Sequence, residues 1–273
     1  MGRIAAVKGL RLWKRHKAPN PALNVPQRNE PVTTDTIYGP GCPAVDDGST
    51  AAQISVGRKS GFCAVEGLGK SDKRYPVALM NHIRKYGAMD QIISDNAKAQ
   101  ISQRVEQILN MLQIKDRTSE PYNKNMNFAE RDWRDSKYAT EYMLNSSNAP
   151  AYTWLLPLEY TCFVRNHTAR ERLQWRMPTE WLLGYTPDIT VLLTFMFWEP
   201  VYYAVDEASW PQDSSESLGR FVGIAENVGA SITYKILTKN MKVISRSVVR
   251  TGTSGWEPLT EPKSQRSGTY TGT

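Results

Sequence analysis

Met89-Asp90-Gln91-Ile92-Ile93-Ser94-Asp95-Asn96 is a short apolar run that ends in an Asp-Asn pair. A second run, Val32-Thr33-Thr34-Asp35-Thr36-Ile37-Tyr38, carries an acidic residue inside a predicted strand. Short runs of this kind, bounded by polar residues, are typical of half-buried or buried strands. Glu130 comes 34 residues after Asn96, at the start of a helical stretch. We therefore predict that Asp35, Asp95 and Glu130 converge from two strands and a helix.

The segments around these acids change in type along the chain. Apolar runs predict strands over 31–38, 51–56, 61–65, 89–94 and 114–118. Helical spacing of apolar residues predicts helices over 75–86, 101–112, 128–144 and 152–166. The strands 51–56 and 61–65 are expected to pair as a hairpin, and the helix 75–86 to stop at Gly87. This order predicts an α/β fold in which helices pack on the faces of a mixed sheet.

The pattern changes from about residue 196 onward. Alternating residues predict strands over 221–224, 231–237 and 241–249, with a turn at Lys239-Asn240. Residues 206–216, which are acidic and rich in Ser, predict a long loop. This part of the chain is expected to form a small all-β, barrel-like domain. Residues 253–273 are rich in Gly, Ser, Thr and Pro and predict a disordered tail.

The positive charge of the chain is concentrated at its start. The 273 residues carry a net charge of +7. Residues 1–29 hold seven basic residues and no acidic one, so the remainder is formally neutral. A basic, flexible arm over residues 1–30 would bind polyanions by releasing counterions. A solvated tail without a partner is an equal alternative, and a targeting segment is disfavoured by Pro19, Pro21 and Pro26.

The cysteines and histidines predict no metal or disulfide framework. Cys42, Cys63 and Cys162 are odd in number and far apart, and the three histidines are equally scattered. We therefore expect structural roles for these residues and a reducing, intracellular compartment. The longest apolar run, 191–198, is too short to cross a bilayer, and no secretory signal is apparent.

The three predicted convergent acids suit divalent metal ions. Magnesium prefers oxygen ligands and takes one or two carboxylates from a protein. Two such ions, Mg²⁺ or Mn²⁺, support phosphoryl chemistry on nucleic acids. Each acid alone has a simpler interpretation as a surface or turn residue. Asp46 and Asp47 are rival candidates, although their Gly-rich loop favours solvated side chains. The metal prediction therefore depends on the joint arrangement of Asp35, Asp95 and Glu130.

One segment resembles a known family. Residues 121–130, Pro-Tyr-Asn-Lys-Asn-Met-Asn-Phe-Ala-Glu, are similar to the loop-to-helix motif of retroelement integrases, especially the copia type. The segments around Asp35 and Asp95 resemble the first and second acidic positions of that family. Downstream, Gly184–Ile189, Leu218–Ala225 and Asn227–Gly229 resemble the segments that follow the catalytic core in copia-type polyproteins. The chain departs from the motif at Lys124, Met126 and Phe128, and it lacks the zinc-binding module that often precedes the core.

The resemblance implies a fold and an activity. It implies an RNase H-like catalytic core over residues 31–190 and a small β-rich domain over 191–252. The implied activity is metal-dependent cleavage and joining of DNA strands, with Asp35, Asp95 and Glu130 as catalytic metal ligands. Element ends and target DNA would be the partners, and self-association is implied because integrases generally act as multimers. We expect a processed, truncated or domesticated piece of an element, located in the nucleus or in a cytoplasmic particle.

Nucleic-acid contacts are expected around the predicted helix that begins near Glu130. Arg131, Arg134 and Lys137 would meet phosphates there, together with Lys124 and Asn96. In the alternative interpretation these cations only offset the acids of a solvated helix. Two other functions stay open at this point. One is a non-enzymatic nucleic-acid-binding module with an integrase fold, and the other is an RNase H-like nuclease that acts on RNA–DNA hybrids.

Overall fold

The computed structural model describes residues 25–70, 74–94, 102–118, 128–205, 216–226, 228 and 232–252. The side chains of Thr118 and residues 128–131 are not described. The chain divides into two compact units, Met1–Thr194 and Phe195–Thr273, and each unit has its own sheet. The predicted functional division at residues 30, 190 and 252 stays a prediction.

The first unit is built on a five-stranded mixed sheet with the strand order β3-β2-β1-β4-β5. The strands are β1 (Pro31–Tyr38), β2 (Ala51–Gly57), β3 (Cys63–Gly67), β4 (Gln91–Ser94) and β5 (Lys115–Thr118). β1 lies at the centre, antiparallel to β2 and parallel to β4. β2 is antiparallel to β3, and β4 is parallel to β5, so only β2 runs against the others. This is the RNase H-like order, and the predicted α/β fold class is confirmed.

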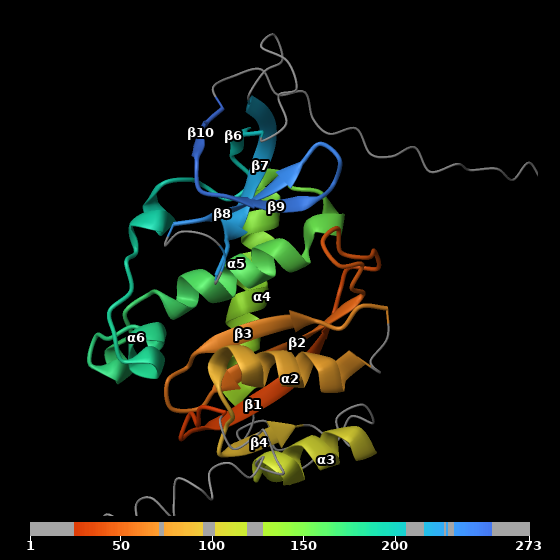
Figure 1. The fold of residues 1–273 in the computed structure, drawn as a ribbon, viewed down its shortest axis with the longest axis vertical. Coiled ribbons are helices and arrows are strands. Elements are labelled where there is room, and N and C mark those ends of the chain that lie inside the picture. Colours follow the sequence, from red (N-terminus) through yellow and green to blue (C-terminus); the bar gives the residue numbers. More distant parts are fainter. Residues whose placement is uncertain are drawn as a thin grey trace, which may run out of the picture. The chain divides into compact units, whose positions relative to one another are not determined.

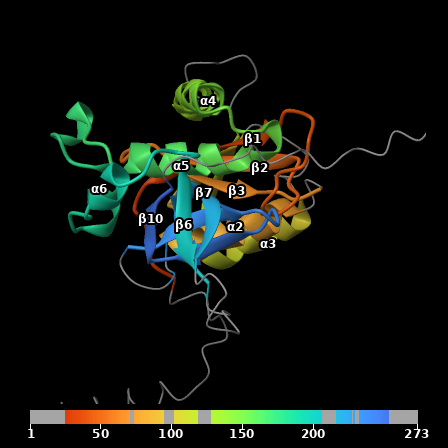
Figure 2. The ribbon, with the colours of Figure 1, turned by 90° about the horizontal axis from the view of Figure 1, so that it is seen from above.

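Helices cover both faces of this sheet. The helices of this unit are α2 (Tyr75–Tyr86), α3 (Gln103–Leu112), α4 (Phe128–Ser147), α5 (Leu155–Asn166) and the short α6 (Pro178–Leu183), with 3₁₀ turns η4 (Ala151–Thr153), η5 (Glu171–Leu173) and η6 (Thr190–Leu193). Residues of α2 and α3 form one buried cluster with Val32 and Ile92 of the sheet. Residues of α5, joined by Trp133 of α4, form a second cluster with Ile37 and Ile54. Figure 2 shows α4 and α5 on one side of this sheet and α2 and α3 on the other.

Most predicted elements of the first unit are present with small shifts at their ends. The first strand and α2 have the predicted bounds. α2 stops at Gly87, which has a φ of 90° and whose amide donates to the Ile83 carbonyl (2.8 Å). β4 begins two residues later than predicted. The predicted helix over 152–166 is a 3₁₀ turn followed by α5. The short helix α6 was not predicted.

The second unit is an antiparallel sheet with the order β10-β6-β7-β8-β9. Its strands are β6 (Pro200–Ala204), β7 (Glu216–Ile224), β8 (Tyr234–Thr238), β9 (Val243–Arg246) and β10 (Val249–Thr251) (Figure 1). Phe195, Phe221 and Tyr234 form an aromatic cluster in its core. The predicted strand 241–249 is two strands, and β6 was not predicted. The predicted loop 206–216 lies outside the described residues except at Glu216, which begins β7.

This second sheet curls strongly. β9 and β10 are at opposite ends of the strand order, yet only Ser247 and Val248 join them. Three virtual bonds of about 3.8 Å span about 11 Å at most, whereas the edges of a flat five-stranded sheet lie about 19 Å apart. Arg246 Nε also donates to the Ala204 carbonyl at the end of β6 (3.2 Å). The two edges therefore approach each other, in agreement with the barrel-like domain predicted for this part.

Residues 25–30 belong to the first unit, which corrects the predicted flexible arm at its C-terminal end. Gln27 forms a parallel bridge with Ala88, and backbone hydrogen bonds join Arg28 N to Ala88 O (2.8 Å) and Ala88 N to Pro26 O (2.7 Å). Arg28 is 6% exposed and Glu30 is fully buried. The Arg28 charge is therefore neutralised inside the protein and is not part of a solvated arm. Residues 1–24 of the predicted arm lie outside the described residues, as does the predicted tail 253–273.

A buried polar network fixes this segment. Arg28 Nη2 donates to Glu30 Oε1 (2.7 Å), and Arg28 Nη1 lies 3.1 Å from His82 Nε2 on α2. The Glu30 carboxylate also accepts from the amides of Lys59 (3.1 Å) and Ser60 (2.9 Å) and from the Ser60 hydroxyl (2.9 Å). One carboxylate thus joins the start of β1 to the turn between β2 and β3. Because a guanidinium can only donate, His82 Nε2 is the acceptor and this imidazole is neutral.

We expect His82 to make stability depend on pH. Burial, together with Arg28 and Lys85, lowers the pKa of His82 to about 3. Between about pH 3 and pH 6.5 the unfolded chain binds a proton there that the native protein does not, so the free energy of unfolding rises with pH in this window by up to about 1.4 kcal/mol per pH unit. Urea unfolding at pH 4.5, 5.5 and 7.5 measures this rise in the free energy of unfolding. His82→Gln keeps an acceptor for Arg28 and should show a shallower slope, whereas an identical slope would contradict the assignment.

Candidate functional site

Asp35 lies in the middle of the central strand. Side chains two residues apart on a strand share a face, so Asp35 is on the same face as Ile37. Its cross-strand partner on β2 is Ile54. Ile37 and Ile54 both belong to the cluster that packs against α5 and Trp133 of α4. Asp35 therefore projects from the centre of the sheet on the face that α4 and α5 cover.

The Asp35 carboxylate is half-buried and oriented. Its Oδ1 accepts a hydrogen bond from the Thr36 amide (2.8 Å). Thr36 in turn donates its hydroxyl to Gln53 Oε1 on β2 (3.0 Å). A half-buried carboxylate held by a backbone donor is a suitable oxygen ligand for a hard cation. Asp35 thus has the oxygen donors and the position that the metal prediction requires of one of its three ligands.

The end of β4 lies beside this position. β1 and β4 run parallel, with Pro31 opposite Gln91 and Thr33 opposite Ile93. β4 ends at Ser94, one residue after Ile93, and Asp35 lies two residues after Thr33 on the neighbouring strand. Both residues therefore lie just beyond the last paired residues of β1 and β4. Asp95 and Asn96 lie outside the described residues.

The first turn of α4 contains Glu130, whose side chain is not described. α4 contacts both β1 and β2. Trp133 packs against the cluster that includes Ile54, the partner of Asp35. Glu130 precedes Trp133 by three residues, so their Cα atoms are about one helical turn apart on the same side of the helix. The backbone therefore brings the start of α4 to the sheet face that carries Asp35.

An ion cluster that the sequence did not predict anchors this end of α4. Arg165 Nη2 on α5 lies 2.5 Å from Asp132 Oδ1, and its Nη1 donates to the Asp132 carbonyl and the Ser136 hydroxyl (both 3.1 Å). Arg170 Nη1 lies 3.8 Å from the same carboxylate oxygen. Asp132 is therefore a structural residue and does not offset Arg134 and Lys137. The sequence showed charged residues on two predicted helices. Which of them form ion pairs depends on how the helices pack against each other.

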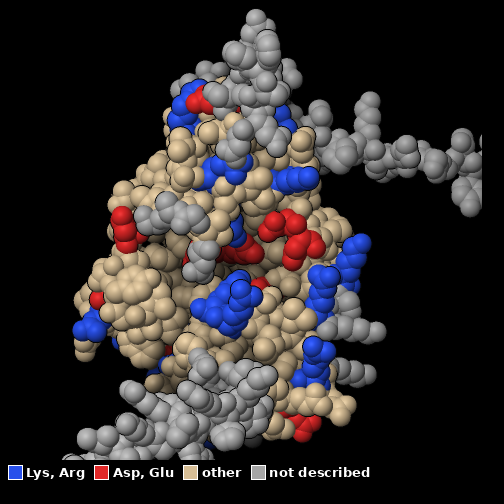
Figure 3. All heavy atoms as spheres, viewed as in Figure 1, with Lys and Arg blue, Asp and Glu red and all other residues tan. Residues whose placement is uncertain are grey.

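The predicted nucleic-acid contacts divide between described and undescribed positions. Arg134 and Lys137 are exposed on α4, whereas Ser136 and Thr140 of the same helix are buried. Lys137 Nζ is 3.7 Å from Glu141, which also agrees with a solvated helix face. The side chain of Arg131 is not described, and Lys124 and Asn96 lie outside the described residues. On the face shown in Figure 3, Lys and Arg side chains are spread among Asp and Glu and form no single patch.

The predicted metal site is only partly within the described residues. Of the three predicted ligands, only the Asp35 side chain is described. Within the described ranges, no group of three or more His, Cys, Asp or Glu residues could hold a metal ion. Cys63 and Cys162 are buried free thiols, and Cys42 is a half-buried one. Across the same ranges, no helix is long and apolar enough to cross a membrane.

No protein-family model and no curated protein matches the chain. Among solved structures, the chain is similar to the catalytic core domain of BIV integrase, with 18% identity over 57% of this chain and 95% of that one and a TM-score of 0.45. The HTLV-2 integrase catalytic core domain in complex with magnesium is 16% identical over 58% and 98%, with a TM-score of 0.44. A simian T-cell lymphotropic virus intasome, in complex with the PP2A regulatory subunit B56 gamma, is 12% identical over 85% and 84%, with a TM-score of 0.45.

Proposed function

We propose that the chain is an integrase-like polynucleotidyl transferase of the copia type, which cuts and joins DNA strands. The observation that carries the proposal is the position of Asp35. It lies in the central strand of an RNase H-like sheet, on the face covered by α4 and beside the end of β4. The proposal adds Asp95, directly after β4, and Glu130, in the first turn of α4, as the other two acids. Asp35, Asp95 and Glu130 would together hold Mg²⁺ or Mn²⁺.

The residues of the chain have separate tasks in this reaction. In phosphoryl transfer a new bond to phosphorus forms as the bond to the leaving oxygen breaks, with the two oxygens in line. When bound, two magnesium ions activate the attacking oxygen and stabilise the leaving one. The Thr36 amide keeps the Asp35 carboxylate oriented. The Asp132–Arg165 pair holds the start of α4, and with it Glu130, against α5. Arg131, Arg134, Lys137, Lys124 and Asn96 would position the DNA backbone.

The proposal includes partners and a location. The substrates would be element ends and target DNA. The chain would act as a homo-oligomer, since an integrase reaction joins two ends to one target and the solved HTLV-2 cores include dimeric and trimeric forms. We place this activity in the nucleus or in a cytoplasmic particle.

A supercoiled-plasmid assay with Mg²⁺ or Mn²⁺ tests the function. Nicked plasmid and strand-transfer products are expected with duplex DNA and either ion, and neither with EDTA. An RNA–DNA hybrid serves as the competing substrate. Cleavage restricted to the hybrid would identify an RNase H-like nuclease instead. Salt-sensitive binding without cleavage of either substrate would indicate a non-enzymatic nucleic-acid-binding module with an integrase fold instead.

A further inference from the structure

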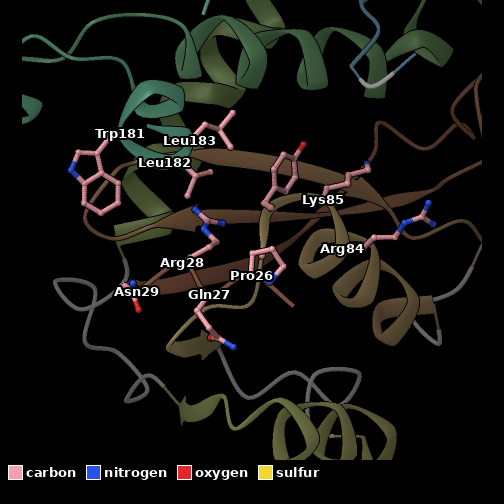
Figure 4. Close-up of a pocket in the computed structure, with 11 residues that line it drawn as sticks. Pro26, Gln27, Arg28, Asn29, Arg84, Lys85, Trp181, Leu182 and Leu183 are labelled. Carbon is pink, nitrogen blue, oxygen red and sulfur yellow. The ribbon is translucent and has the colours of Figure 1, made fainter. Parts of the chain in front are cut away.

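We infer that a hollow at the end of α2 binds one nucleotide of a single nucleic-acid strand. The hollow has a volume of about 430 Å³, which suits a ligand of nucleotide size. Its walls come from three segments of the first unit, as Figure 4 shows: Pro26–Asn29 before β1, Arg84–Gly87 at the end of α2, and Trp181–Leu183 of α6. None of these residues belongs to the site around Asp35.

The charge of the hollow favours an anionic ligand. Its lining residues include Arg28, Arg84 and Lys85 and no acidic residue, although the buried Glu30 neutralises the charge of Arg28. Lys85 is paired with Glu66 (2.6 Å), so its charge is partly offset. Arg84 lies on the exposed side of α2 at the edge of the hollow. A phosphate group is the natural partner for an exposed arginine in this position.

A buried donor of the hollow has no acceptor within the described part of the chain. Arg28 is 6% exposed and lines the hollow. Its two terminal nitrogens contact Glu30 and His82, but Nε, although buried, has no hydrogen-bond partner among the described residues. Leaving a buried donor unsatisfied is unfavourable. Because Nε is closed to solvent, a ligand in the hollow does not reach it, and Arg84 is an accessible cation of the lining.

The opposite wall offers aromatic and apolar surface. Trp181 is 38% exposed on α6, and Leu183 next to it is also exposed. Tyr86 is half-buried on the α2 side. Bases stack on aromatic side chains when they are free of a duplex, which is why proteins that bind single strands combine aromatic residues with a basic groove. Trp181 therefore favours an unpaired base over a smooth duplex surface.

The proposed function, in which nucleic acid is the partner, favours a strand over a free nucleotide. Pro26 in the wall of the hollow follows the basic, acid-free residues 1–24. The inference rests on nucleic acid as the partner in the proposed function, but it needs neither the three acids nor a metal ion. Binding can therefore be measured separately from catalysis.

Fluorescence anisotropy of the full chain with a labelled oligodeoxythymidylate of about 12 nucleotides, in EDTA, tests the inference. Trp181→Leu and Arg84→Glu should each weaken binding about tenfold. Matched controls are Trp175→Leu, since Trp175 is 72% exposed outside the hollow, and Lys115→Glu on β5. The controls should bind as the unchanged protein does. Circular dichroism confirms that each variant is folded.

Three results would overturn the inference. The first is equal binding by Trp181→Leu and the unchanged protein. The second is a mononucleotide that competes as well as the oligonucleotide at equal phosphate concentration, because the hollow would then take a free nucleotide. The third is stronger binding of polyglutamate, which would indicate an acidic peptide. If Trp181→Leu weakens binding but the unchanged protein does not cleave plasmid, only the proposed function fails. If the unchanged protein cleaves plasmid but Trp181→Leu binds the oligonucleotide normally, only this inference fails.

Discussion

Asp35→Asn is expected to lower metal-dependent DNA cleavage by about 1000-fold or more, which corresponds to about 4 kcal/mol of transition-state stabilisation. The substitution removes one negative charge from the proposed metal site and leaves the shape of the side chain nearly unchanged. An asparagine Oδ1 can still accept from the Thr36 amide. The free energy of unfolding should therefore change by no more than about 1 kcal/mol. Single-turnover cleavage and urea unfolding measure the two effects.

The control for this prediction is Asp116→Asn. Asp116 lies exposed on the edge strand β5 of the same sheet, so it experiences the same chemical change away from the proposed site. This variant should cleave DNA at the unchanged rate. Cleavage that survives Asp35→Asn, or that is lost equally in both variants, would remove Asp35 from the catalytic residues. A variant that binds DNA normally but does not cleave it would agree with a role in catalysis alone.

The sequence predicted the elements whose pattern is local. β1 alternates around Asp35, and that alternation places Asp35 on the face of Ile37 without any coordinates. α2 carries apolar residues at helical spacing and stops at a glycine. β6 and α6 were not predicted, although the shorter strands β4 and β5 were. The break at Ser247–Val248 was missed because it depends on the curl of the whole second sheet.

The site was predictable to the extent that its residues occupy regular elements. Alternation and helix phase place Asp35 and the start of α4, whereas Asp132–Arg165 joins two helices whose packing a single sequence does not encode locally. The Arg28–Glu30 pair was similarly hidden, because Arg28 was counted with the basic arm. One signal was present in the sequence. Glu30 is the first acidic residue of the chain and directly precedes a buried strand, where an unpaired carboxylate would be costly.

Glu30→Ala is expected to destabilise the protein by about 3–5 kcal/mol, since removing one partner of a buried pair leaves the other charge uncompensated. Arg28 would lose its carboxylate, and the amides of Lys59 and Ser60 would lose their acceptor. The backbone is built closely around this carboxylate. A Cβ atom added at Gly57 would lie 2.5 Å from Glu30 Oε1. Urea unfolding measures the loss, and hydrogen exchange at the Ser60 amide should show where it begins.

Glu141→Ala provides the comparison for this prediction. Glu141 pairs with Lys137 on the exposed side of α4, where both side chains are about half exposed. Exposed pairs contribute about 0–1 kcal/mol, so this variant should unfold almost as the unchanged protein does. If Glu30→Ala cost no more than Glu141→Ala, the network could not be what fixes residues 25–30 to the sheet. A large loss for Glu30→Ala alone would mean that the start of β1, and with it the position of Asp35, depends on one buried carboxylate.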